Sequence, residues 1–249
     1  MQLSDLKELV ANAIRIDTLV AAHWSLANKM PQVSSAWNKV RAELYDVGLL
    51  YAPENKNDGG YLDQIELEVV AIHSLGEAGY VLERTRWISR LAGYREGVIY
   101  LPVDLPCQAY VPGSTLTDTI RHEYAHAWHW LEPDFFERPW FRKGFKGGYE
   151  DCRVRPSEVF ADEVWRRHRR AVNKCRSVRE FNALMRRLFF DEFVSDYAGT
   201  LFCEDFADTF MVFLRHRNNL SRFKKRTGVY RKLLAIQRAV AQARQELGS

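Results

Sequence analysis

Long hydrophobic runs and clustered cysteines are both missing from this sequence. No apolar stretch approaches the roughly 20 residues that a transmembrane helix needs, so we expect no membrane span. The N-terminus, MQLSDLKELVANAIRIDTLVAAHW, is interrupted by charged residues and therefore lacks the apolar core of a secretory signal peptide. The four cysteines include no Cys-x-x-Cys pair, which predicts reduced thiols in a cytoplasmic protein rather than a disulfide framework.

Acidic residues are scarce in the last third of the chain. Residues 161–249 hold 19 basic and 10 acidic residues, whereas residues 1–160 hold 17 and 22. Two runs, WRRHRRAVNKCRSVRE (165–180) and RFKKRTGVYRK (222–232), interleave cations with aromatic residues. Such runs are typical of solvated helix faces or of surfaces that bind DNA or RNA. No zinc-ribbon, helix-turn-helix or RNA-binding motif accompanies them, so a nucleic-acid-associated protein is kept as an alternative function.

Apolar residues recur mostly at helical spacing, which predicts a predominantly helical α+β fold with one small sheet. The spacing within residues 37–47 is one example. The loop PENKNDGG (53–60) separates an N-terminal helical region, residues 1–55, from a second domain covering residues 56–249. Further helices are expected at residues 61–80, 116–132, 156–172, 203–217 and 228–247.

The expected sheet lies within residues 86–103, where two β-prone runs flank the turn-like AGYREG and predict a hairpin. Pro102 ends the second run, GVIYLP, which indicates an edge strand or the end of a strand. An exposed edge there could pair with an extended peptide. Residues 134–156 contain several glycines and prolines and are expected to be a loop.

The stretch IRHEYAHAWHW (120–130) contains the pattern H-E-x-x-H. On a helix, His122 and His126 project from the same face and can bind one metal ion through their imidazoles. Glu123 lies one position further round, where it can accept a proton from a metal-bound water. His129 follows too closely to complete the site and is interpreted as a boundary residue. Thr115 and Asp118 resemble a capping box that starts this helix.

A catalytic zinc ion usually has three protein ligands, and two downstream segments offer the third. SEVFADEVW presents Glu158 four residues before Asp162, and CEDFADTFM presents Glu204 four residues before Asp208. In each pair the second carboxylate could accept an N–H from a ligating imidazole and fix its tautomer. Spacing alone does not choose between Glu158 and Glu204.

The motifs together resemble the gluzincin metallopeptidases. More specifically, FVSDYAGTLFCEDFADTF resembles a pattern in the clan that includes the catalytic domain of anthrax lethal factor and related bacterial zinc peptidases. The resemblance implies a zincin-like fold, with Glu204 as the third zinc ligand, Tyr197 facing the substrate carbonyl, and Asp208 as the supporting acid. It covers under a third of the chain, and the segment 134–192 is an insertion relative to it.

The sequence therefore predicts a metallopeptidase with one Zn²⁺ ion held by His122, His126 and Glu204. Glu123 would activate the zinc-bound water that hydrolyses the peptide bond of a protein or peptide substrate, and Tyr197 would stabilise the oxyanion. Glu158 stays the alternative third ligand. A regulatory protein that retains the zincin shell is a further alternative, although such a scaffold has no chemical need for the complete set of residues.

Overall fold

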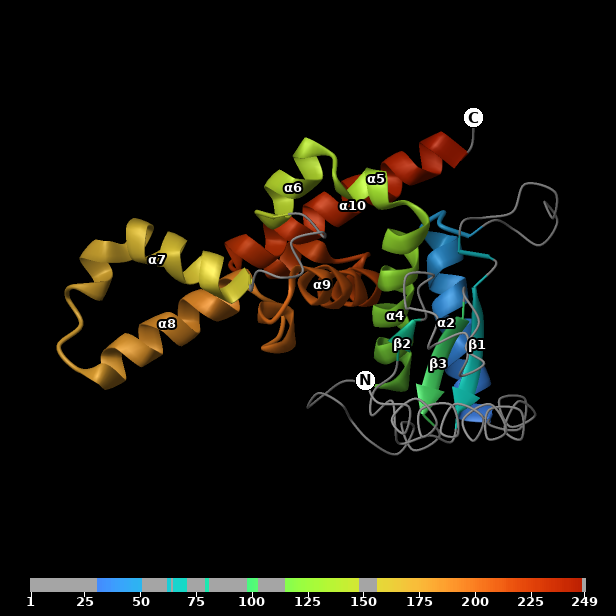
Figure 1. Ribbon diagram of the computed structural model, residues 1–249, viewed down its shortest axis with the longest axis horizontal. Coiled ribbons are helices and arrows are strands. Elements are labelled where there is room, and N and C mark those ends of the chain that lie inside the picture. Colours follow the sequence, from blue (N-terminus) through green and yellow to red (C-terminus); the bar gives the residue numbers. More distant parts are fainter. Residues whose placement is uncertain are drawn as a thin grey trace, which may run out of the picture. The chain divides into compact units, whose positions relative to one another are not determined.

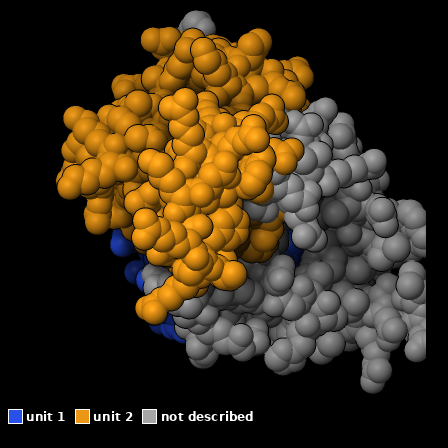
Figure 2. Space-filling view, turned by 90° about the vertical axis from the view of Figure 1, so that its left-hand side faces the viewer, with its two compact units in different colours: residues 1–131 blue, residues 132–249 orange. Residues whose placement is uncertain are grey.

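The structure is a computed structural model, and it describes residues 31–50, 62–63, 65–70, 79–80, 98–102, 115–147 and 156–247. Helices predominate over one small sheet, so the predicted α+β, mostly helical class is confirmed (Figure 1). The chain forms two compact units, residues 1–131 and 132–249 (Figure 2), and each is described separately below. No helix in the described part of the chain is long and apolar enough to cross a membrane.

The first unit contains a mixed three-stranded sheet with strand order β1–β3–β2. Strand β1 (Glu66–Val70) runs parallel to β3 (Val98–Pro102), and β2 (Gly79–Tyr80) runs antiparallel to it. The helix predicted over residues 61–80 is therefore wrong at both strands. The apolar residues of such a short segment fit both the helical and the strand period, and pairing with β3 favours the extended form.

Strand β3 occupies the centre of this sheet. Ile99 and Tyr100 pair with β1 on one side and with β2 on the other. The prediction of an edge strand is therefore wrong. The expectation that an extended peptide pairs with this strand depended on an exposed edge and is wrong as well. Pro102 is the last residue of the strand, so the predicted strand end is confirmed. Residues 86–97, the first part of the predicted hairpin, lie outside the described part of the chain.

Helices α2 (Pro31–Asp46) and α4 (Leu116–Leu131) pack against each other beside the sheet (Figure 1). Trp37 of α2 stacks on Tyr124 of α4, with ring centroids 5.1 Å apart. Thr115 and Asp118 form the predicted capping box: the Thr115 N–H donates to Asp118 Oδ2 at 3.0 Å, and the Asp118 N–H donates to Thr115 Oγ1 at 3.3 Å. Both ends of α4 agree with the sequence prediction, since Pro133 starts the next helix.

Arg121 forms a buried ion cluster between α2 and α4. Its guanidinium donates to both carboxylate oxygens of Glu43 at 2.6 and 2.7 Å and to Asp118 at 2.5 Å. All three residues are less than 10% exposed. The bidentate pairing fixes the rotation of α4 about its axis. Because Arg121 precedes His122 in the chain, this cluster also orients the histidine pair.

The second unit is built around an aromatic core. The helices that contribute to it are α5 (Pro133–Phe136), α6 (Pro139–Phe145), α9 (Phe202–His216) and α10 (Thr227–Leu247). Phe136, Phe141 and Phe145 each pack within 6.0 Å of the Phe206 ring. Residues 134–145 are thus largely helical rather than a loop, and a proline at the first position of each short helix helps to start it.

Two other helices of the second unit form a helical hairpin, α7 (Pro156–Val172) followed by α8 (Val178–Glu192) (Figure 1). Helix α7 was predicted and α8 was missed. Its signal is present in the sequence, because the Ser177 hydroxyl caps the helix by accepting the Glu180 N–H at 3.1 Å. The predicted helices at 203–217 and 228–247 correspond to α9 and α10. The proposed division into residues 1–55 and 56–249 stays a prediction.

Candidate metal centre

Helix α4 brings His122 and His126 together on one face. Their Nε2 atoms lie 3.1 Å apart, and one donates a hydrogen bond to the other, depending on the tautomers. The two rings meet edge to face, with centroids 4.8 Å apart. The opposite face of α4 is buried through Ile120, Tyr124 and Trp128, so packing fixes the direction in which the histidines point.

Glu204 lies in the first turn of α9 in the second unit. The helix begins at Phe202, after an extended Leu201, and the carboxylates of Glu204 and Asp205 suit the positive end of the helix dipole. The Cys203 thiol approaches Glu204 Oε1 at 3.7 Å. Phe206 and Phe210 anchor the following turns in the aromatic core.

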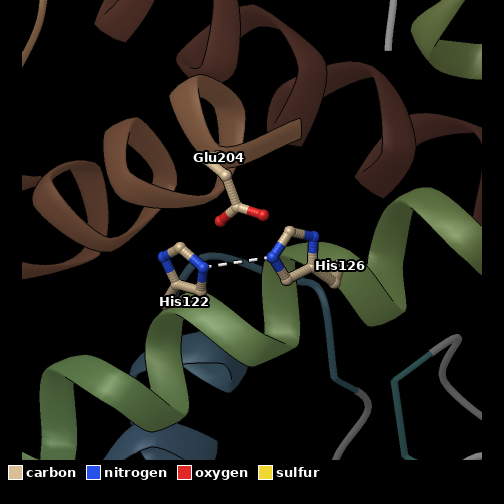
Figure 3. Close-up of side chains that lie close together, drawn as sticks. All are labelled: His122, His126 and Glu204. Carbon is tan, nitrogen blue, oxygen red and sulfur yellow. Dashed lines mark hydrogen bonds between the residues drawn. The ribbon is translucent and has the colours of Figure 1, made fainter. Parts of the chain in front are cut away.

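His122, His126 and Glu204 form a group of side chains that could hold a metal ion (Figure 3). Two nitrogens and one carboxylate oxygen are a donor set that suits zinc. Tetrahedral zinc with bonds of ~2.0–2.1 Å separates two ligand nitrogens by about 3.3–3.4 Å. The 3.1 Å spacing of the two Nε2 atoms therefore differs from that value by only a few tenths of an ångström.

Two predicted catalytic residues lie between members of this group along the chain. Glu123 follows His122 on α4 and is 5% exposed. Tyr197 begins the short 3-10 helix η6 (Tyr197–Gly199), seven residues before Glu204, and its side chain is 40% exposed. An exposed tyrosine is suited to contact a substrate. A buried glutamate is suited to hold a proton away from bulk water.

The structure gives Asp208 a contact that the sequence did not predict. Its carboxylate accepts a short hydrogen bond from the Ser195 hydroxyl, and Ser195 Oγ accepts the Ala198 N–H at 2.9 Å. Asp208 thereby ties helix α9 to the turn that carries Tyr197. The predicted contact of Asp208 with a ligating imidazole stays a prediction.

The competing ligand Glu158 belongs to the first turn of α7, and its side chain lies outside the described part of the chain. His129 lies in the last turn of α4 and is not in the three-residue group. The choice between Glu158 and Glu204 as the third ligand therefore stays a prediction.

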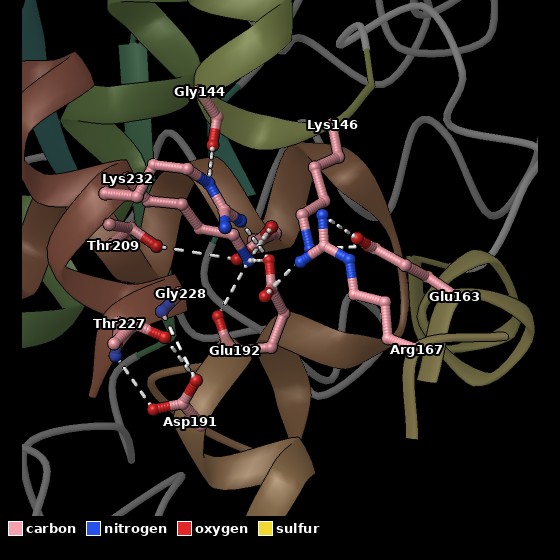
Figure 4. A network of polar contacts seen from close by, with 12 residues as sticks. Gly144, Lys146, Glu163, Arg167, Asp191, Glu192, Thr209, Thr227, Gly228 and Lys232 are labelled. Carbon is pink, nitrogen blue, oxygen red and sulfur yellow. Dashed lines mark hydrogen bonds and ion pairs between the residues drawn. The ribbon is translucent and has the colours of Figure 1, made fainter. Parts of the chain in front are cut away.

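A buried charge network supports the first turn of α9, and sequence reasoning missed it (Figure 4). Lys232 of α10 is 1% exposed, and its ammonium lies 2.7 Å from Asp205 Oδ2 and donates to the Glu192 carbonyl at 2.9 Å. The Glu192 carboxylate also pairs with Arg231 and, at 3.2 Å, with Lys146. Since Asp205 follows Glu204, the network fixes the backbone from which Glu204 projects.

The Asp205 carboxyl predicts a specific pH dependence. Burial raises its pKa to about 6, because the loss of water outweighs the attraction of Lys232. The folded protein therefore binds this proton more tightly than the unfolded chain, whose carboxyl titrates near pH ~4. The contribution of Asp205 to stability is fully present at low pH and is lost as the pH rises through about 6.

We expect the unfolding free energy of the wild type, relative to Asp205→Asn, to fall by on the order of 2 kcal/mol from pH ~4 to ~6. Urea unfolding at several pH values measures this difference. The exposed Asp134 gives the matched control, since Asp134→Asn should follow the wild-type pH profile. A parallel profile for Asp205→Asn and the wild type would contradict the assignment.

Comparison with known proteins does not extend the resemblance: no family model, no curated protein and no solved structure matches the chain. The relation to gluzincins therefore stays a prediction based on the quoted motifs.

Proposed function

We propose that the protein is a zinc-dependent peptidase in which His122, His126 and Glu204 hold a single metal ion. The observation that carries the proposal is the three-residue ligand group, two members of which belong to an H-E-x-x-H motif. Three protein ligands leave a coordination position for water and substrate, as in catalytic rather than structural zinc sites.

Each protein residue has a defined task in the proposed reaction. A bound zinc ion would lower the pKa of water towards ~7 and polarise the peptide carbonyl. Glu123 takes the proton of the attacking water and passes it to the leaving amine. The Tyr197 hydroxyl donates a hydrogen bond to the oxygen of the carbonyl as negative charge develops on it. The Asp208–Ser195–Ala198 chain positions the Tyr197 turn.

Two histidines and a carboxylate also suit non-haem iron, so the donor set alone does not fix the metal. Glu123 favours zinc-dependent hydrolysis of a peptide bond, because a carboxylate next to the first ligand provides the base that this reaction needs. We therefore expect about one zinc per chain, measured by elemental mass spectrometry on protein purified without added metal. A wild-type protein that holds no metal, or only iron, would overturn the proposal.

Removing Glu204 should weaken zinc binding strongly. Residues that only orient a ligand are worth about 10–100-fold in metal affinity, so loss of a ligand in Glu204→Ala should cost at least about 100-fold. Competition with a chromophoric chelator measures the affinity. Glu158→Ala is the matched control and should bind zinc as the wild type does. The reverse result, with Glu158→Ala losing the metal, would transfer the third-ligand role to Glu158.

A further inference from the structure

The α7–α8 hairpin carries an unusually dense positive surface. Residues 165–187 contain nine cations and one acidic residue, Glu180. The nine side chains are all exposed. We refer to them as the basic hairpin surface: Arg166, Arg167, Arg169, Arg170, Lys174, Arg176, Arg179, Arg186 and Arg187.

Most of these nine cations form no ion pair within the described part of the chain. Among the described residues, Arg167 is the only one of the nine cations in an ion pair, with Glu163 at 2.8 Å. The second basic run of the sequence behaves differently. Arg226 donates to the backbone carbonyls of Phe190 and Phe193 at 2.6 Å, and Lys232 is buried. The structure thus separates two runs that are similar in sequence.

A basic pocket lies at the base of the hairpin, where α7 meets α6 and α10. Its volume is about 650 Å³, and five of its six lining side chains are cationic: Lys143, Lys146, Arg166, Arg167 and Arg231, with Glu163 as the sixth. Lys146 and Arg231 are partly neutralised by Glu192. Lys143 and Arg166 have no ion pair within the described part of the chain, so the pocket retains positive charge.

The hairpin is poorly suited to a lipid surface. Its apolar faces are already packed together, through Phe160 and Val164 of α7 and through Phe189 and Phe193 beside them. A helix that lies in a membrane interface needs a continuous apolar face, whereas the exposed large apolar residues of the described hairpin are three separate positions, Trp165, Val178 and Phe190. The exposed Trp165 stands instead beside Arg166, with its side chain 53% exposed.

We propose that the basic hairpin surface, together with the pocket at its base, binds the phosphate backbone of a nucleic acid. Eight of the nine cations are arginines, whose planar guanidinium groups match phosphate oxygens in pairs. Trp165 offers a ring on which an unpaired base can stack. This binding is independent of the metal centre, since none of its residues belongs to the ligand group.

Fluorescence anisotropy with a labelled mixed-sequence 20-base oligonucleotide, single-stranded and as a duplex, tests the proposal. We expect micromolar binding at low salt that weakens steeply as salt is added, because phosphate contacts release counterions. Neutralising three unpaired arginines, in Arg169→Gln/Arg170→Gln/Arg179→Gln, should weaken binding at least about tenfold. It should also lower the slope of log K against log salt by about 2.

A matched triple variant distinguishes the effect of this surface on binding from the effect of net charge. Lys224→Gln/Lys225→Gln/Arg244→Gln removes the same charge from exposed positions elsewhere in the second unit and should change binding less than about twofold. Trp165→Ala should weaken single-strand binding about tenfold and duplex binding less. Equal losses in both triple variants would overturn the proposal. So would binding to phosphatidylserine vesicles or to polyglutamate as tight as binding to the oligonucleotide.

Discussion

Replacing Glu123 by glutamine is expected to abolish peptide hydrolysis while leaving the metal in place. The amide has nearly the same shape as the carboxylate, so it can occupy the same buried position, but it cannot accept the proton of water. General bases contribute about 10²–10⁴-fold to rate, and the loss in kcat should fall in that range. Cleavage of a peptide library, followed by mass spectrometry, measures the rate beside the zinc content.

Tyr197→Phe provides the comparison within the same site. It should lower kcat by about 10²–10³-fold if its hydroxyl donates to the developing oxyanion, while the zinc content stays unchanged. Because Tyr197 is exposed, loss of the hydroxyl should not unfold the protein. A Glu123→Gln protein that cleaves at the wild-type rate would remove the general-base assignment. One that loses zinc would indicate that Glu123 holds the metal or its ligands.

The parts of the site that could be predicted from sequence depend on local geometry. The side chains of His122 and His126 share a face because they are four residues apart on a helix, and Thr115 and Asp118 mark where that helix begins. None of this depends on the rest of the fold. Helix α9 is also predictable from local spacing, since its buried face is lined by Phe202, Phe206, Phe210 and Phe213.

The wrong and missing predictions depend on distant partners or on overlooked local signals. Residues 66–70 form a strand because β3 supplies a partner about 30 residues away, which no local pattern encodes. Helix α8 could have been found, because Ser177 and Glu180 form an S-x-x-E capping signal. Lys232 was not predictable, since a lysine within a basic run normally lies in water. Its burial depends on Asp205 from another helix.

The largest stability effect is expected at Arg121. Replacing it by alanine leaves the carboxylates of Glu43 and Asp118 buried without their cation, and breaking such a buried cluster costs about 3–5 kcal/mol. That is a large part of the ~5–15 kcal/mol by which a typical domain is stable. Urea unfolding measures the total loss, and hydrogen–deuterium exchange of peptides from residues 116–131 locates it in α4. Zinc affinity should fall as well, because α4 orients both histidines.

Two further variants separate charge from packing. Arg138→Ala also removes an arginine from an ion pair, but this pair, with Glu246, lies on the surface. The substitution should therefore cost no more than about 1 kcal/mol. Combining Glu43→Met with Arg121→Met removes one buried carboxylate together with its cation and should recover much of the stability lost in Arg121→Ala. A loss below about 1 kcal/mol in Arg121→Ala would mean that Glu43 and Asp118 find other partners. The orientation of the histidine pair would then depend on the packing of Tyr124 and Trp128 alone.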